Sequence, residues 1–212
     1  MKRSISLVAT ISICFFAAAQ NPKYISAMEK NIVLLDTARN PAQLQSLANS
    51  FERIAGGEKA EWLPNYYAAY CYAKMSQNTK GDAIDTYCDK ADIFINKADS
   101  LNPNNSEVYA VKAQIASARI SVNPMIRGQK YGTLSAELRD KAKGFDPANP
   151  RPWLLEGEGN FYTPAAFGGG KKKAKSSFEK ALALYETFKP TSSIHPHWGK
   201  GEANYFLKQC NE

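Results

Sequence analysis

The phrase LNPNN at residues 101–105 returns as FDPAN at residues 145–149. Both follow one pattern: an apolar residue, Asn or Asp, Pro, any residue, and Asn. Proline stops a helix, and asparagine is favoured where helices end and begin. A turn that is written twice, 44 residues apart, indicates that a structural unit is repeated.

Apolar residues on both sides of these turns recur at helical spacing, and no stretch alternates in the manner of a β-strand. Pro or Gly stands at nearly every junction between the helical segments. The pattern predicts helical hairpins at about 22–57, 62–101, 105–145 and 149–188, followed by a terminal helix at about 197–210. We therefore expect an all-α protein.

The second helices of these hairpins resemble those of the tetratricopeptide repeat. That repeat places small residues on both sides of a large apolar residue, and a proline after the helix. The matching sets are Ala91, Ile95, Ala98 and Pro103; Ala174, Phe178 and Ala181; and, with larger residues, Leu47, Phe51 and Ile54. Arg139 falls where another unit needs its large apolar residue, and Leu138 is an alternative one position earlier. The resemblance implies hairpins stacked as a short right-handed solenoid with one continuous core.

The spacing of the units departs from the family. The aligned positions Phe51, Ile95, Arg139 and Phe178 are 44, 44 and 39 residues apart, whereas the tetratricopeptide unit has about 34 residues. We expect insertions near residues 76–85, 123–132 and 163–170, as longer helices or longer loops. Another αα-solenoid, with a period of about 40–47 residues, is the rival interpretation.

A second, local resemblance covers TPAAFGGGKKKAKSSFEKAL at residues 163–182. This stretch is similar to a pattern in the periplasmic T-component of tripartite substrate transporters, which are exported helical proteins with divergent tetratricopeptide repeats. The resemblance implies an accessory role in periplasmic solute transport.

The amino terminus has the composition of an export signal. Lys2 and Arg3 precede a mostly apolar run at residues 4–16, and Ala17-Ala18-Ala19 offers small residues for cleavage. This order predicts a secretory signal peptide at residues 1–19 and a protein in the periplasm or outside a bacterial cell.

The mature chain is then a single domain at residues 20–212. A lipid anchor at Cys14 is the alternative, although Ile13 stands where such sites need a small residue. Without the signal peptide, 25 basic and 20 acidic residues leave a net charge of +5. This small excess, on an exported chain, does not favour nucleic acid as a partner.

Three cysteines remain after cleavage: Cys71, Cys88 and Cys210. Export permits disulfides, and Cys71 and Cys88 stand at equal distances from the expected turn of their hairpin. The sequence leaves two alternatives open, a Cys71–Cys88 disulfide or two buried free thiols.

A glycine loop precedes a run of lysines at Gly169-Gly170-Lys171-Lys172-Lys173. Free N–H groups at the start of a helix can bind an anion. A nucleotide-binding loop needs Lys followed by Ser or Thr after a strand, and this stretch has neither feature. The loop is therefore a candidate site for an anion or an acidic partner, with solvated surface as the simpler interpretation.

His195 and His197 are the two histidines of the chain. A zinc site usually takes three or four protein ligands, and no catalytic motif accompanies these residues or the cysteines. We expect no catalytic residue, metal or cofactor, and we keep an enzyme that uses His or Cys on a helical scaffold as an alternative.

The tetratricopeptide resemblance implies a groove lined by the first helices of the hairpins. Counting from the two turn prolines places these residues in it: Arg151, Leu154, Glu158, Phe161, Tyr162, Gln114 and Ser117. The function expected is a non-catalytic exported scaffold that holds a protein, peptide or small ligand, of unknown identity, in this groove.

Overall fold

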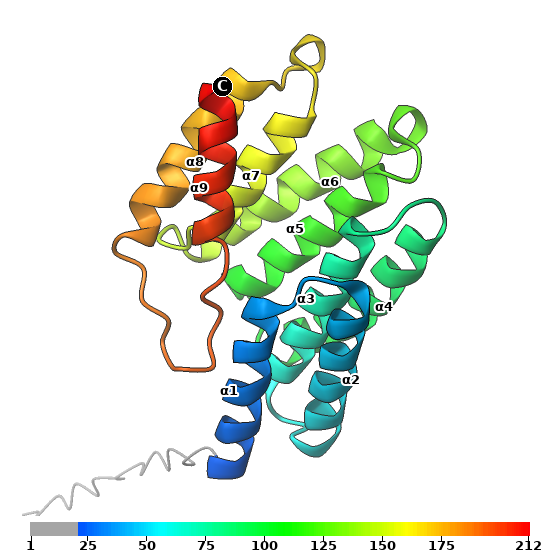
Figure 1. Ribbon diagram of the computed structural model, residues 1–212, viewed down its shortest axis with the longest axis vertical. Helices are drawn as coiled ribbons and strands as arrows, with labels where there is room; N and C mark the ends of the chain where they lie inside the picture. The colour runs from blue at the N-terminus through cyan, green and yellow to red at the C-terminus, as the bar shows by residue number, and fades with distance from the viewer. Residues whose placement is uncertain (1–20) are drawn as a thin grey trace, which may run out of the picture.

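The computed structural model describes residues 21–212, and these fold into nine α-helices and one short 3-10 helix, with no β-strand. The helices are α1 (Pro22–Thr37), α2 (Pro41–Gly57), α3 (Trp62–Gln77), α4 (Ala83–Leu101), α5 (Ser106–Ile120), α6 (Pro124–Phe145), α7 (Arg151–Tyr162), η1 (Ala165–Phe167), α8 (Lys171–Tyr185) and α9 (Lys200–Asn211). Consecutive helices pair as antiparallel hairpins that stack along the molecule (Figure 1). The predicted all-α class of stacked hairpins is confirmed. The expected signal peptide and Cys14 lie outside the described residues.

The repeated phrases perform the same task in both places. In the first, Asn102 ends α4, and the Asn105 side chain accepts a hydrogen bond from the Glu107 N–H at 2.8 Å, which caps α5. In the second, Asp146 ends α6, and the Asn149 side chain accepts from the Arg151 N–H at 2.9 Å. Each phrase closes one hairpin and opens the next, because capping satisfies N–H groups that the helix leaves unpaired.

The expected insertion at residues 123–132 is not a loop. Asn123 accepts a hydrogen bond from the Ile126 N–H at 3.2 Å and Pro124 occupies the first turn, so α6 begins there and runs for 22 residues. By contrast, residues 163–170 form a loop that contains η1 and a left-handed Gly168.

The buried side chains form two cores. The N-terminal core draws on α1 to α5 and on Ile194, and the C-terminal core draws on α7, α8 and α9. Small residues allow close packing within each: a Cβ on Gly157 would stand 2.4 Å from the Phe178 ring. Trp198 packs against both cores.

The long connection between α8 and α9 extends toward α1 before it turns back (Figure 1). Its last residue, Gly199, has a φ of +109°, and a Cβ there would overlap the Tyr185 hydroxyl. Glycine is therefore required where the connection enters α9. This path places residues 194–202 against the first helices of the N-terminal hairpins.

Candidate functional site

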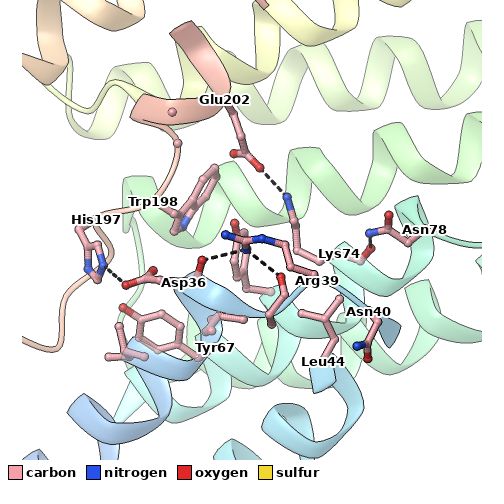
Figure 2. Close-up of a pocket in the computed structure, with 16 residues that line it drawn as sticks. Asp36, Arg39, Asn40, Leu44, Tyr67, Lys74, Asn78, His197, Trp198 and Glu202 are labelled. Carbon is pink, nitrogen blue, oxygen red and sulfur yellow. Dashed lines mark hydrogen bonds and ion pairs between the residues drawn. The ribbon is translucent and has the colours of Figure 1, made fainter. Parts of the chain in front are cut away.

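A groove with two hollows lies between the first helices of the hairpins and the C-terminal segment. The N-terminal hollow, of about 480 Å³, is bounded by α1, the start of α2, α3 and residues 197–202 (Figure 2). The C-terminal hollow, of about 560 Å³, is bounded by α3, α5, α6, α7 and α9. Both volumes fall within the range of roughly 300–1,000 Å³ that is typical of ligand sites.

An ion pair separates the two hollows. Lys74 on α3 and Glu202 on α9 line both of them, and their charged atoms are 2.6 Å apart (Figure 2). Asn78, which also lines both, donates to the Lys74 carbonyl at 2.8 Å. The pair ties the last helix to the second hairpin and neutralises the Lys74 ammonium.

Aromatic and polar side chains together line the N-terminal hollow. Tyr70 stacks on Trp198 with ring centroids 4.8 Å apart. His197 Nε2 lies 3.0 Å from an Asp36 carboxylate oxygen, which orients the imidazole (Figure 2). The Arg39 guanidinium donates to the Asp36 carbonyl at 2.9 Å. The aromatic rings and the polar groups that line this hollow are therefore already engaged with one another.

The C-terminal hollow has an exposed aromatic mouth. Tyr162 on α7 is 72% exposed, and its ring meets the Phe206 ring of α9 edge to face at 5.9 Å. Phe206 in turn stacks on the buried Phe178 at 5.4 Å, which fixes it in place. Aromatic rings that solvent can reach suit stacking against a flat apolar ligand.

Two ionisable side chains without an ion-pair partner face this aromatic mouth. Burial, and then the negative charge of Glu202, raise the pKa of the half-buried Glu158 to about 8, although Lys74 opposes this. Burial also lowers the pKa of the Arg139 guanidinium, although the charges of Glu156 and Asp140 oppose this. Among the described residues, Glu158 forms no hydrogen bond or ion pair, and Arg139 pairs with no carboxylate. At neutral pH the hollow therefore offers a mostly protonated carboxyl and a guanidinium without an ion-pair partner among the described residues.

The groove residues expected from the sequence divide into two groups. Glu158, Tyr162 and Ser117 line the C-terminal hollow together. Phe161 is half-buried and packs edge to face on Phe206 at 5.3 Å.

The remaining groove predictions point into the core. Leu154 and Arg151 are 0% exposed, and Gln114 is 4% exposed. Arg151 Nη1 pairs with a Glu107 carboxylate oxygen at 2.7 Å, so it links α7 to α5 and does not face a ligand. These residues were assigned to the groove by counting positions from the turn prolines. Because each position along a helix turns the side chain by about 100°, an error of one position in that count moves a residue from the groove to the core.

The predicted anion loop is largely closed on itself. The Gly169 N–H donates to the Pro164 carbonyl at 3.2 Å, and the Gly170 N–H donates to the Asn160 carbonyl at 2.8 Å. Lys173 Nζ donates to the Gly168 carbonyl at 2.9 Å, while Lys171 and Lys172 stay exposed. The glycines serve the turn, since a Cβ on Gly169 would overlap the Thr163 carbonyl.

The cysteines do not form the disulfide that the sequence left open. Cys71, Cys88 and Cys210 are free, and the first two are 0% exposed. Burial raises the pKa of Cys88 to about 11 and that of Cys71 still higher. The Cys88 thiol lies 3.7 Å from the Ile115 carbonyl of α5 instead.

The two histidines have different surroundings. His195 Nδ1 lies 2.7 Å from the Ser192 hydroxyl within one turn of the connection, and its ring packs edge to face on Trp62. Across residues 21–212, no three His, Cys, Asp or Glu side chains gather as metal ligands. No helix in that part of the chain is long and apolar enough to cross a membrane.

Sequence reasoning missed the residues that come from distant parts of the chain, namely Lys74, Glu202 and Phe206. No local signal marks them. Arg139 did carry a signal, because it is a charge at an apolar position of the repeat.

Solved structures similar to this chain include a haemophore and a tetratricopeptide-repeat protein. One is the HusA haemophore from Porphyromonas gingivalis, with a TM-score of 0.81 and 36% sequence identity over 91% of this chain and 94% of that chain. The other is a thermophilic tetratricopeptide-repeat protein from Thermus thermophilus, with a TM-score of 0.64 and 16% identity over 88% of this chain and 80% of that one. The second likeness shows the fold alone, and it agrees with the predicted tetratricopeptide-like architecture.

No protein-family model matches the chain, and no curated protein sequence matches it. The family therefore rests on the first solved structure, whose identity extends over nearly the full length of both chains. On that evidence, the chain belongs to the same family as the HusA haemophore.

Proposed function

We propose that this protein is an exported, non-catalytic carrier that binds a haem-type porphyrin in the C-terminal hollow. The observation that carries the proposal is the 36% identity, over 91% of the chain, to a haemophore. Export accords with the signal peptide expected at residues 1–19. A transport-accessory role and a peptide partner remain predictions that no observation here favours.

The chemistry of the hollow supports this ligand. A porphyrin has a flat apolar ring and two carboxylates, so it needs an aromatic surface and a cation. Tyr162 and Phe206 offer the rings, and Arg139 offers the cation, all within the same hollow. Glu158 adds little repulsion at neutral pH, since its pKa of about 8 keeps it mostly protonated.

The test is a titration of ferric haem into the purified chain, followed by the haem absorbance and by quenching of tryptophan fluorescence. We expect saturation at one haem per chain. Metal-free protoporphyrin should be run in parallel, because a protein that holds the ring and the carboxylates binds both forms.

A pair of matched variants separates a site from surface adhesion. Tyr162→Ala should weaken haem binding roughly 5-fold, as expected for the loss of one stacking contact. Phe167→Ala is the control, because Phe167 is 77% exposed and does not line the hollow. Binding that never saturates, or that both variants weaken equally, would contradict a carrier site in this hollow.

A further inference from the structure

Arg139 occupies a position that belongs to the apolar packing of the repeat. In the second helix of each other hairpin, a large apolar residue stands four residues after one inward-facing residue and three before another. These sets are Leu47, Phe51 and Ile54 in α2; Ala91, Ile95 and Ala98 in α4; and Ala174, Phe178 and Ala181 in α8. In α6 the same spacing gives the buried Ser135 and Ala142, with Arg139 between them. The three apolar counterparts of Arg139 are each 0% exposed.

The Arg139 side chain is held between neighbouring units. Its Nη1 donates to the Ser135 hydroxyl at 2.7 Å, and that hydroxyl donates to the Ala113 carbonyl of α5 at 2.9 Å. The same Nη1 lies 3.7 Å from the place where a Cβ on Gly159 of α7 would stand. The guanidinium therefore lies at the junction of α5, α6 and α7, where it lines the C-terminal hollow.

Arg139 is an exception among the arginines that the described fold buries or half-buries. Arg119 pairs with Asp85, Asp89 and Asp92, Arg127 pairs with Asp85, and Arg151 pairs with Glu107. Arg139 has a serine hydroxyl and no carboxylate among residues 21–212. The carboxylates of Glu156 and Asp140 lie near enough to favour its charge, but neither forms an ion pair with it. Burying a charge without a direct ion pair destabilises the fold, so the free protein lacks an interaction that a ligand can supply.

We propose that Arg139 is the anion-binding residue of the C-terminal hollow and that it pairs with a carboxylate of the bound ligand. If the ligand is the porphyrin of the proposed function, on which this extension rests, that carboxylate is a propionate. The ring then lies toward Tyr162 and Phe206, which line the same hollow. Lys74 is a weaker candidate, because Glu202 already neutralises it at 2.6 Å.

The decisive experiment compares haem with haem dimethyl ester, in which both carboxylates are esterified. The wild-type protein should bind haem about 10- to 100-fold more tightly than the ester, as expected for a charge-assisted hydrogen bond. Arg139→Met should bind both forms with similar affinity, near that of the wild type for the ester. Methionine suits the test, because it restores an apolar residue at an apolar repeat position and should preserve the fold.

Arg53→Met is the matched control. Arg53 is an exposed arginine of α2 that lacks a carboxylate partner among the described residues and does not line the C-terminal hollow, so this variant should discriminate as the wild type does. Circular dichroism and thermal melting of each variant would establish that it is folded. Discrimination that persists in Arg139→Met would overturn the proposal and assign the carboxylate to another cation. Equal binding of haem and ester by the wild type would overturn it as well, while the proposed function would stand.

If no porphyrin binds, the proposed function is overturned. A second probe then still tests whether Arg139 binds a carboxylate. Benzoate, a minimal aromatic carboxylate, would be titrated while the Arg139 side-chain N–H signals are followed by NMR. A saturable shift in the wild type, with no corresponding binding by Arg139→Met, supports a carboxylate site for a ligand of another class. If no porphyrin binds and benzoate causes no shift either, the assignment of Arg139 is overturned.

Discussion

Glu158 places a titratable carboxyl in the C-terminal hollow without a hydrogen-bonding partner among the described residues. Burial is the main cause that raises its pKa from 4.5 to about 8, followed by the charge of Glu202, while Lys74 acts in the opposite direction. A carboxyl that is easier to protonate in the folded chain than in the unfolded chain favours the fold at low pH. This contribution is complete below pH 4.5 and is lost as the pH rises to about 8.

Glu158→Gln should remove that loss. We expect its free energy of unfolding at pH 8 to exceed that of the wild type by about 1–3 kcal/mol, less than the full shift implies because the side chain is only half-buried. Near pH 4 the two proteins should be equally stable. Urea denaturation at pH 4, 6 and 8 measures this, with Glu137→Gln, at an exposed position of α6, as the control. A difference that stays constant with pH would contradict this account.

Individual packing residues were predictable where the repeat pattern fixes them. Ile95 and Phe178 were expected as large apolar residues of the core, and both are fully buried. Arg139 broke the pattern visibly, but sequence alone offered Leu138 as a substitute one position away. The structure leaves both half-buried, so the tertiary fold was needed to show where the guanidinium lies.

Among the helices, the buried pair of Glu107 and Arg151 joins α5 to α7. Arg151 Nη1 lies 2.7 Å from the Glu107 carboxylate, and the guanidinium also faces the Phe188 and Trp198 rings at 4.8 and 5.1 Å. Its Nε and Nη2 find no hydrogen-bond partner among the described residues. The carboxylate is therefore the one strong compensation that the described part of the chain shows for this buried charge.

Glu107→Leu should lower the free energy of unfolding by about 3–5 kcal/mol, because it leaves Arg151 buried and unpaired. Adding Arg151→Met should recover most of that loss, since neither charge then remains. Both variants and the double variant would be measured by urea denaturation. The exposed pair of Lys175 and Glu179 serves as the control, with an expected coupling below about 1 kcal/mol. Additive effects of the two core changes would show that the pair does not act as a unit.

The cysteines of α3 and α4 give a direct chemical test of the hairpin packing. In the native protein at pH 8, Cys210 should react with a thiol reagent, while Cys71 and Cys88 stay protected by burial and by their raised pKa values. In denaturant all three should react, in addition to Cys14 where the amino terminus is retained. Two fewer reactive thiols after denaturation would show that Cys71 and Cys88 are joined.

The hairpins were predictable because their ends carry strong local signals, whereas one helix start was not. The sequence predicted an insertion near residues 123–132 and left open whether it is a longer helix or a longer loop. In α6 nothing lies within 4 Å of a Cβ built on Gly128 or Gly132, and Met125 and Ile126 are 90% and 78% exposed. The Asn123-Pro124 cap therefore starts a helical turn that has little packing of its own, which is why apolar periodicity did not reveal it.

Across the full stack of hairpins, the C-terminal segment connects residues that are far apart in sequence. The Tyr67 hydroxyl donates to the Ile194 carbonyl at 3.0 Å, and Trp198 Nε1 donates to the Tyr66 hydroxyl at 2.8 Å. Stacked repeats usually contact only their neighbours. No local pattern in the sequence indicates such closure, so the two-hollow groove that it creates could not be predicted.

Trp198 is one of the residues that couple the two cores, because it packs against both of them. It stacks on Tyr70 of α3, and its carbonyl accepts a hydrogen bond from the Tyr185 hydroxyl of α8 at 2.9 Å. Trp198→Ala should therefore lower the free energy of unfolding by about 3–5 kcal/mol and allow the C-terminal core to unfold before the N-terminal core.

Two tryptophans report on the two cores separately, since Trp62 packs against the N-terminal core and Trp153 against the C-terminal core. In the Trp198→Ala background, Trp153→Phe leaves Trp62 as the one tryptophan and reports on the N-terminal core. Trp62→Phe leaves Trp153 and reports on the C-terminal core. Their urea transitions should separate, whereas the same Phe replacements made with Trp198 present should give coincident transitions. Tyr205→Ala, at a position of α9 that is 60% exposed, controls for loss of an aromatic ring. Coincident transitions in the Trp198→Ala proteins would mean that the stacked hairpins alone, through their neighbour contacts, make the molecule unfold as one unit.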